Sequence, residues 1–576
     1  MIKRLIPFFK GYGKWALLAP LTVIAETVCE LLIPLQMARI VDVGIENMDM
    51  RVILISAVWM LVLATLAMLA GTVSAKAASY AAQGMGANLR RAQFEKISSF
   101  SFADIDRFSS ASLITRLTND LTNLQNVAIM CLRMIVRALT MLIAAVILSI
   151  TLSPRLAVIS CLVFPVLAIC VGGLMYVCHP LFRRMQKAVD DLNEKVQENL
   201  VAIRVVKAYV RENHERKKFQ TANDNFTKAG LSAVLRIVLM QPIMMTGISV
   251  TTVLVLYQGA PLVLNGSLGV GDLNTVINYI FQILFSVLMV AMALLQFVRA
   301  RASADRIFEV LDTVPEIQDG AATQFPAKTG SVEFQNVSFK YTATGTGEDV
   351  LREVDFKVEP GEFVAIVGGT GTGKSSLVNL IPRFYDATDG SVLVDGMDVR
   401  EYPLDELRGR IGMVLQNNVL FSGTIRENLL WGDPNATEEE VIQAAKDAQA
   451  YDFIRSFPDG FDTYLEQGGV NVSGGQKQRL CIARAMLRKP AILILDDSTS
   501  AVDSTTESLI RESFKSNLKG TTVIIIAQRI SSVQYADKII VLDQGTVAGI
   551  GSHDELMAGN AIYQEIYWSQ QEGVSE

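Results

Sequence analysis

Hydrophobic residues in the first half of the chain gather in long, almost uninterrupted runs, whereas in the second half they fall in short runs between polar segments. Six long runs lie near residues 15–41, 52–82, 127–153, 156–179, 232–264 and 270–298. A helix needs about 20 apolar residues to cross the hydrocarbon layer of a membrane. The pattern therefore predicts six membrane-spanning helices.

Basic residues separate the two sides of this predicted membrane domain. Lys and Arg are frequent before the first span and in the long connections 83–126 and 181–231, whereas the short connections carry only Arg51 and Arg155. Because cytoplasmic loops carry the excess of positive charge, both termini and the long connections are predicted to be cytoplasmic. The short outer loops leave no room for an extracellular receptor domain.

Composition divides the chain at about the same place as the hydrophobic pattern. Of 576 residues, 50% are hydrophobic and only 7% aromatic, and the formal net charge is −6. Charged residues are sparse and mainly basic up to about residue 300, and denser and mainly acidic beyond it. The high hydrophobic content excludes a disordered or fibrous chain. The change in charge and in hydrophobic pattern predicts a transmembrane domain at 1–310 with two long cytoplasmic loops, a linker at 311–330 and a soluble domain at 331–576.

Two acidic residues, Glu26 and Glu30, lie within the first predicted span and share a helix face because they are four positions apart. An ionisable side chain in lipid costs about 2.5 kcal/mol or more unless it reaches water or a partner. The two carboxylates could form an internal pair with a basic residue such as Arg133 or Arg137, or they could contact cationic substrates. The sequence leaves both readings open.

Methionines are frequent in the last two spans, namely Met240, Met244, Met245, Met289 and Met292. Flexible thioether side chains can line an adaptable binding pocket, but they also serve as ordinary packing in apolar helices. Either role is consistent with the sequence.

The soluble half contains a phosphate-binding loop in its expected context. An apolar strand at 363–367 leads into the pattern G-x-x-x-x-G-K-[ST]. Backbone amides of such a loop close around phosphates, Lys374 reaches the β and γ oxygens, and the Ser375 hydroxyl can ligate Mg²⁺. The predicted ATP-binding residues of this loop are Gly369, Thr370, Gly371, Thr372, Gly373, Lys374, Ser375 and Ser376.

Two further segments belong with this loop. The buried-strand pattern at 491–495 ends in Asp496 and Asp497, and a carboxylate at the end of a parallel strand beside a phosphate loop is suited to organising Mg²⁺. Between the two motifs, Ser473 precedes Gly474, Gly475 and Gln476 and then a helical stretch. Its position predicts a helix N-cap with backbone amides directed outward.

Together, six spans and these motifs resemble a half-transporter of the ABC exporter family over nearly the whole chain. The resemblance implies an all-α six-helix transmembrane domain followed by an α/β P-loop nucleotide-binding domain, with ATP and Mg²⁺ as cofactors. It implies that Tyr341 stacks on adenine and that Gln416 joins Ser375 and Asp496 at the metal and the attacking water. It also implies that Ser473 to Gln476 and Asp503 act at the ATP held by a second subunit. Segments 113–118 and 203–208 resemble the loops that dock onto the ATPase domains.

Two positions depart from the family pattern. The catalytic carboxylate after the magnesium aspartate is usually Glu, but here it is the shorter Asp497. The switch residue is usually His, but here it is Gln528, which has no titratable imidazole. Because Ser473 to Gln476 remain nearly intact, the pattern predicts one subunit of a heterodimeric bacterial multidrug exporter, with a degenerate site of its own and a signature that completes the partner's site. A slower homodimer with tolerated substitutions is the alternative.

The predicted function is therefore ATP-driven export of amphipathic or drug-like molecules by alternating access, as a multi-pass protein of the bacterial cytoplasmic membrane. The expected partners are a different half-transporter, the lipid bilayer and a small amphipathic substrate, with no nucleic acid. A lipid flippase of the same family, an ATP-gated channel and an ATP-binding membrane sensor remain as alternatives.

Overall fold

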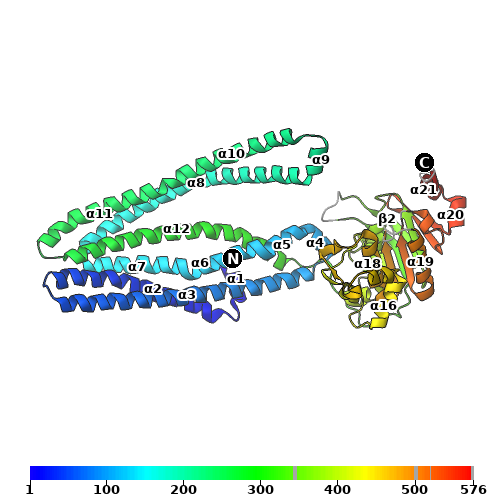
Figure 1. The fold of residues 1–576 in the computed structure, drawn as a ribbon, viewed down its shortest axis with the longest axis horizontal. Coiled ribbons are helices and arrows are strands. Elements are labelled where there is room, and N and C mark those ends of the chain that lie inside the picture. Colours follow the sequence, from blue (N-terminus) through cyan, green and yellow to red (C-terminus); the bar gives the residue numbers. More distant parts are fainter. Residues whose placement is uncertain (342–346, 498–503, 519, 528, 573–576) are drawn as a thin grey trace. The chain divides into compact units, whose positions relative to one another are not determined.

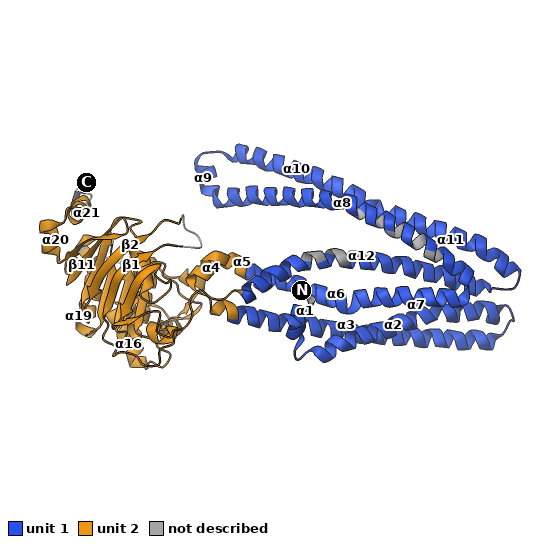
Figure 2. Cartoon of the chain, turned by 180° about the vertical axis from the view of Figure 1, so that it is seen from behind, with its two compact units in different colours: residues 1–95, 114–312 blue, residues 96–113, 313–576 orange. Residues whose placement is uncertain are grey.

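The computed structural model describes residues 1–341, 347–497, 504–518, 520–527 and 529–572 (Figure 1). The chain forms two compact units, coloured separately in Figure 2. The first contains residues 1–95 and 114–312, and the second contains residues 96–113 and 313–576. A short stretch of the first long connection, 96–113, thus groups with the C-terminal residues.

Long helices make up the first unit (Figure 1). After a short N-terminal turn, α1 (Ile2–Leu5), they are α2 (Gly13–Arg39), the N-terminal part of α3 (Met50–Ser98), α6 (Leu121–Met130), α7 (Val136–Leu152), α8 (Pro154–Val201), α9 (Ile203–Ala208), α10 (Glu212–Val238), α11 (Met240–Leu264) and α12 (Val270–Asp312). A π-helical stretch, Cys131–Ile135, joins α6 to α7. The helices α8 and α10 run side by side, and α9 closes their end.

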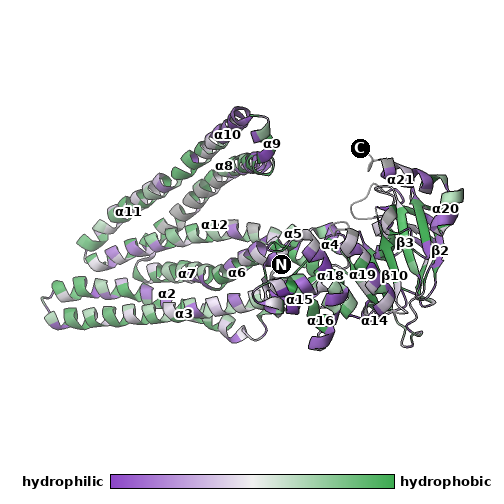
Figure 3. Ribbon diagram, turned by 45° about the vertical axis from the view of Figure 1, so that its right-hand side comes forward, coloured by the Kyte–Doolittle hydropathy of each residue, from purple (hydrophilic) through white to green (hydrophobic). Residues whose placement is uncertain are grey.

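Five of the helical segments in the described residues are long and apolar enough to span a membrane, namely Gly13–Ile45, Met50–Ser98, Ser110–Leu152, Glu212–Leu264 and Val270–Val290. They include five of the six predicted spans. The other predicted span, 156–179, lies within α8, a continuous helix of 48 residues. Figure 3 shows the underlying pattern, since α7 and α11 are mainly hydrophobic whereas the chain around α9 is hydrophilic.

The second unit is built on two sheets. The larger has the order β12-β11-β3-β10-β9-β6, with β12 antiparallel and the other neighbours parallel. Its strands are β3 (Phe363–Gly368), β6 (Ile411–Val414), β9 (Ile492–Asp496), β10 (Thr522–Ile526), β11 (Lys538–Asp543) and β12 (Thr546–Gly551). The smaller antiparallel sheet has the order β2-β1-β4-β5, with β1 (Val332–Phe339), β2 (Leu351–Val358), β4 (Asp389–Val394) and β5 (Met397–Asp398).

Helices and a small hairpin complete this unit. The helices are α4 (Phe102–Phe108), α5 (Ser110–Thr115, which crosses into the first unit), α13 (Lys374–Leu380), α14 (Leu404–Gly409), α15 (Ile425–Leu430), α16 (Glu438–Asp447), α17 (Tyr451–Ser456), α18 (Gly474–Leu487), α19 (Ser504–Asn517), α20 (His553–Gly559) and α21 (Ala561–Glu572). The hairpin pairs β7 (Gly423–Thr424) with β8 (Tyr464–Leu465).

Both faces of the larger sheet are buried, which explains why its parallel strands are apolar without alternation. On β9, Leu493 and Leu495 pack into the cluster that includes α18, whereas Ile492 and Ile494 pack into the cluster on the other face. Side chains that alternate between two buried faces must all be apolar. The apolar run of β9 therefore ends at its last residue, Asp496.

Candidate functional site

The carboxyl ends of the parallel strands bring the predicted nucleotide residues to one edge of the larger sheet. The loop 368–373 follows β3, Asp496 ends β9, and Gln416 lies just beyond β6, whose Val414 is in register with Leu495. Open α/β sheets bind their ligands at this edge. The structure thus gathers motifs that are far apart in the sequence.

The phosphate loop turns from β3 into α13 as predicted. Gly373, with a φ of 92°, forms the left-handed N-cap of α13, and a Cβ there would meet Leu351 Cδ2 at 2.9 Å and the Val350 carbonyl oxygen at 3.0 Å. Only glycine fits this turn without strain. The Lys374 ammonium donates to the carbonyl oxygens of Gly368 at 3.0 Å and Gly369 at 2.6 Å, so its side chain lies across the loop.

Electrostatics at the loop suit a nucleotide with a divalent cation. Burial lowers the pKa of Lys374, against the opposing charges of Asp497 and Asp496. Burial likewise raises the pKa of Asp496, and the neighbouring Asp497 charge adds to this rise, while the Ser375 hydroxyl bond and Lys374 oppose it. Mg²⁺ would neutralise the carboxylates of Asp496 and Asp497, and the phosphate oxygens would neutralise the ammonium of Lys374.

The predicted metal ligands fit Mg²⁺ as a donor set. The Ser375 hydroxyl donates to Asp496 Oδ1 at 3.0 Å, so the hydroxyl and carboxylate predicted to act at one ion are in contact. The Gln416 side chain is exposed at the same edge of the sheet. Mg²⁺ prefers such oxygen ligands and keeps several waters beside them. When bound, the ion would neutralise charge that develops on the β and γ phosphates.

Asp497, the shorter replacement for the usual Glu, has an unusual backbone. Its φ is 47°, in the left-handed region, and its N–H donates to the Ile526 carbonyl oxygen at 3.1 Å. Asp tolerates this conformation better than most residues because its short polar side chain can bond locally. The residue lies near enough to Lys374 and Asp496 to affect the pKa of each. The residue is therefore at the phosphate loop, with a carboxylate one methylene shorter than Glu.

The predicted adenine-stacking residue lies beside the phosphate loop. The Tyr341 hydroxyl forms a hydrogen bond of 2.9 Å with the Ser376 hydroxyl, which is buried. Its ring meets Tyr385 edge to face, with centroids 5.3 Å apart. A cavity of about 180 Å³ lies along Tyr341 and Tyr385 and reaches Asp106.

The contact with Asp106 shows that α4, which lies just before the predicted docking segment 113–118, packs on the nucleotide-binding fold. The docking role of residues 113–118 stays a prediction. Tyr385 donates to Asp106 Oδ2 at 2.9 Å, and the Phe102 and Phe384 rings lie 4.6 Å apart. Burial and the Asp106 bond raise the pKa of Tyr385. An aromatic path thus joins Tyr341 to α4.

The signature segment forms the predicted helix start. Ser473 is the N-cap of α18 and accepts from the Gln476 N–H at 3.3 Å, while the Ser473 N–H donates to Gln476 Oε1 at 2.9 Å. This capping box uses the Gln476 side chain for the helix itself. The amides of Gly474 and Gly475 donate to no group in the described residues, and they begin a helix of 14 residues.

Two predicted site residues, Asp503 and Gln528, lie outside the described residues. Their roles stay predictions. The strand β10, which precedes Gln528, ends at Ile526 and is in register there with Asp496.

The acidic pair in the first span has a basic partner. Arg137 donates to Glu26 Oε1 at 2.6 Å and to both carboxylate oxygens of Glu30, at 2.9 and 2.8 Å. Of the two alternatives, the internal ion pair is therefore present, with Arg137 as its cation. Both carboxylates that were candidates for binding a cationic substrate are therefore already bonded to Arg137.

Two family profiles and several known proteins match this chain. The profile described as "ABC transporter transmembrane region" matches residues 16–288, and the profile described as "ABC transporter" matches residues 351–500. The "Uncharacterized ABC transporter ATP-binding protein YfiB" of Bacillus subtilis is 39% identical over 99% of this chain and 98% of its own length. The chain belongs to the ABC transporter family.

Other relatives narrow the class to ABC exporters. The "Putative multidrug export ATP-binding/permease protein YgaD" of B. subtilis is 36% identical and covers 84% of this chain and 83% of its own length. The "ATP-dependent lipid A-core flippase" of Syntrophus aciditrophicus is 33% identical and covers 85% and 81%. A solved structure titled "Structure of a bacterial Atm1-family ABC exporter with ATP bound" matches with a TM-score of 0.78, 26% identity and 98% of both chains. The fold is that of an ABC exporter half-transporter, and the family implies ATP binding and ATP-coupled transport.

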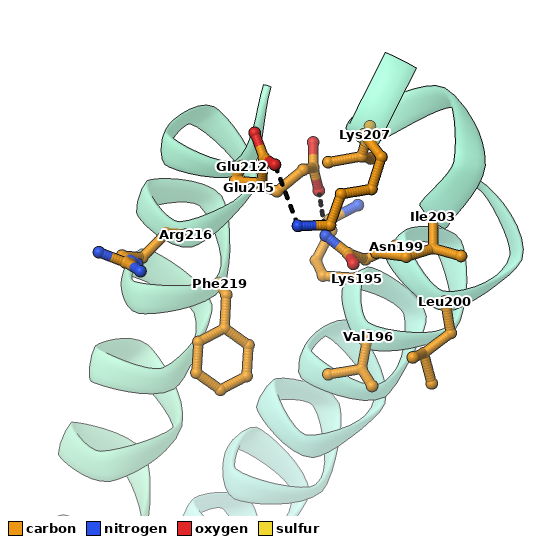
Figure 4. Close-up of a pocket in the computed structure, with 11 residues that line it drawn as sticks. Lys195, Val196, Asn199, Leu200, Ile203, Lys207, Glu212, Glu215, Arg216 and Phe219 are labelled. Atoms are coloured by element: carbon orange, nitrogen blue, oxygen red, sulfur yellow. Dashed lines mark hydrogen bonds and ion pairs between the residues drawn. The ribbon is translucent and has the colours of Figure 1, made fainter. Parts of the chain in front are cut away.

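The second predicted docking segment of this ABC exporter, 203–208, forms α9. A cavity of about 310 Å³ lies beside it, between the ends of α8 and α10 (Figure 4). Lys207 donates to Glu212 at 3.1 Å and Asn199 donates to Glu215 at 3.3 Å, which tie the α8, α9 and α10 ends together. Both bonds lie outside the predicted membrane spans.

Sequence reasoning missed Tyr385 and α4. Tyr385 and Asp106 are 279 positions apart, and neither lies in a recognisable motif. The only local signal was the capping box at the start of α4, where Ser101 and Asp104 bond reciprocally. That signal predicts a helix but not what packs against it.

Proposed function

We propose that this ABC exporter moves amphipathic or drug-like molecules out across the bacterial cytoplasmic membrane by alternating access, as one half of a heterodimer. Its termini are cytoplasmic in this proposal. Its own ATP site is catalytically impaired, and its signature segment completes the working site of a different half-transporter.

The contrast between two parts of the nucleotide-binding fold carries the proposal. At the chain's own site, Asp497 replaces the longer Glu that is usual in the family. Misplacing a catalytic group by about 1 Å can cost about a hundredfold in rate. The signature, by contrast, has a capped helix with two uncommitted amides, at Gly474 and Gly475. Binding groups are retained where hydrolysis groups are altered.

Co-purification tests the assembly. We expect a tag on this chain, expressed in its native membrane, to bring down a second half-transporter with Glu and His at the positions of Asp497 and Gln528. Expressed alone, the chain should bind ATP and hydrolyse it slowly. A homodimer with rapid, substrate-stimulated hydrolysis would contradict the heterodimer.

Transport assays test the direction and the substrate. ATP-dependent accumulation of an amphipathic dye against its gradient in inverted vesicles separates an exporter from an ATP-gated channel, which only equilibrates, and from a sensor, which moves nothing. Lipid translocation is the second candidate function, favoured by the 33% identity to the lipid A-core flippase. A labelled lipid in the same vesicles would change leaflets without accumulating in the lumen.

A further inference from the structure

A cavity of about 470 Å³ lies among the helices of the transmembrane unit, and two residues of opposite charge in its lining, Glu26 and Arg133, each have a buried polar atom without a hydrogen-bond partner among the described residues. Glu26, Arg133 and Arg137 are the charged residues in its lining. Glu26 is only 7% exposed, and its Oε2 has no hydrogen-bond partner among the described residues. The Arg133 Nε is likewise buried and without a partner there.

Leaving either atom unpaired is costly. A buried donor or acceptor without a partner costs about 1–3 kcal/mol, and more when the group is charged. The other carboxylate oxygen of Glu26 is committed to Arg137 at 2.6 Å, so it is Oε2 that remains available. A ligand that offers a donor to Oε2 and an acceptor to Arg133 would satisfy both groups.

The other charges nearby are already paired. Arg137 divides its guanidinium between Glu26 and Glu30, and Glu30 does not line the cavity. Arg133 makes no ion pair with a described carboxylate and lies in the π-helical stretch Cys131–Ile135. Such stretches within longer helices are frequent at functional sites. Arg133 is thus the cation left for a ligand.

The rest of the lining is apolar and adaptable. Apart from Asn126, it consists of aliphatic, aromatic and thioether side chains, namely Val23, Ile129, Met130, Met134, Met141, Phe285 and Met289. A neighbouring cavity of about 560 Å³ shares Asn126, Met130 and Met134 and adds Met292. Methionines repack around apolar groups of different shapes. This surface suits a hydrocarbon tail.

We propose that this cavity binds a zwitterionic amphiphile. Its anionic group faces the Arg133 guanidinium, its ammonium donates to Glu26 Oε2, and its apolar tail lies along the methionines. This rests on the proposed export function and names the class of its substrate. It replaces the prediction that Glu26 and Glu30 together select cations, because Arg137 holds both of them.

Three probes with one fluorescent acyl chain test the charge rule. One carries an ethanolamine phosphodiester, a zwitterion. The second carries an ethyl phosphodiester, which lacks the ammonium, and the third carries a primary ammonium alone. Binding and ATP-dependent movement are measured with the assembled transporter, purified through a tag on this chain and placed in vesicles. The wild type should bind the zwitterion about tenfold or more tightly than either single-charge probe, the size expected for one hydrogen bond to a charged group.

Substitutions test which residue binds the anionic group of the probe and which binds its ammonium. Arg133→Gln should weaken both phosphodiester probes about tenfold and leave the ammonium probe unchanged. Glu26→Gln should remove the advantage of the zwitterion over the ethyl phosphodiester. Glu30→Gln is the matched control, because Glu30 pairs with the same Arg137 outside the cavity, and it should leave the ranking unchanged. If Arg133→Gln does not assemble, Arg133→Lys serves, and it should weaken the phosphodiester probes relative to the ammonium probe.

The outcomes separate this inference from the function beneath it. Movement of all three probes with equal affinity, or the same ranking in the Arg133 and Glu26 variants as in the wild type, overturns the zwitterion site and leaves export standing. Hydrolysis of ATP without movement of any probe by the wild type overturns the export function itself.

Discussion

The ATP site and the transmembrane cavity are assembled in different ways. Around the ATP site, the phosphate loop, Gln416 and Asp496 lie at the carboxyl ends of the parallel strands β3, β6 and β9, and each motif is contiguous in the chain. The cavity takes its lining from α2, from α6 and α7 with the stretch between them, and from α12, at positions from 23 to 289. The residues of the ATP site lie in short sequence motifs, whereas the cavity forms only when helices that are distant in the sequence pack together. In the account proposed above, the first site drives the molecule and the second selects its substrate.

The largest expected effect is at the signature. In the assembled complex, Gly475→Glu should reduce ATP hydrolysis by about a hundredfold or more, because the added carboxylate would repel the phosphates and displace them from the amides at the helix start, and losing the stabilisation of one donor is worth about 3–4 kcal/mol. Gly409→Glu, which places the same charge at an open glycine of the same fold, should leave the rate unchanged. The measurement is steady-state hydrolysis, and equal effects of the two variants would contradict the role of the signature.

Restoring the family's catalytic pair should have the next largest effect. With the partner's catalytic glutamate neutralised, Asp497→Glu together with Gln528→His should raise the remaining hydrolysis by up to about a hundredfold, since about 1 Å of displacement can cost that much. Single-turnover hydrolysis measures this. No gain from the double variant, in a complex that still binds ATP, would mean that these two positions do not limit the site.

The contrast between local motifs and helix packing also determines which features could be predicted from the sequence. The P-loop, the strand that ends at Asp496 and the Ser473 N-cap could be predicted because strand period, glycine turns and caps are local signals. The partner of Glu26 could not be chosen between Arg133 and Arg137, since they lie on the same stretch of chain four positions apart. Only the helix packing decides that Arg137 takes both carboxylates. The docking of α4 on Tyr385 is likewise a tertiary event without a local signal.

The ion pair gives the next test, on stability. Arg137→Met leaves two carboxylates without a cation and should lower the free energy of unfolding by about 3 kcal/mol, at the low end for a buried pair because the Arg137 side chain is 30% exposed. Replacing Glu26 and Glu30 by Gln in the same chain should restore most of the loss. Thermal melting in detergent measures both, with the exposed Arg155→Met as control. Failure of the Gln replacements to rescue would show that Arg137 stabilises the fold by packing rather than by charge.

The smallest effect is expected at Asp496. Burial raises its pKa in the folded protein, so its ionised form lowers stability as pH rises through that pKa. Asp496→Asn should therefore raise the melting temperature of the nucleotide-free protein at neutral pH, and the difference should vanish as pH falls below the ordinary carboxylate range. Stabilisation by ATP with Mg²⁺ should be lost in the same variant. Asp543→Asn, at the end of β11 in the same sheet, is the control for both melts. A lower melting temperature at neutral pH would contradict the desolvation argument.

The asymmetry between the chain's own site and its signature is tested most directly by measuring steady-state ATP hydrolysis of the co-purified complex with Lys374→Ala and with Gly475→Glu, side by side. In the proposed heterodimer, Lys374 holds ATP at the impaired site, so its loss should lower the rate several-fold without abolishing it, about the effect of one weakened charged contact. In the same proposal, Gly475 serves the site where hydrolysis occurs, so its replacement should silence the complex. Equal losses from the two variants would show two equivalent sites and contradict the account.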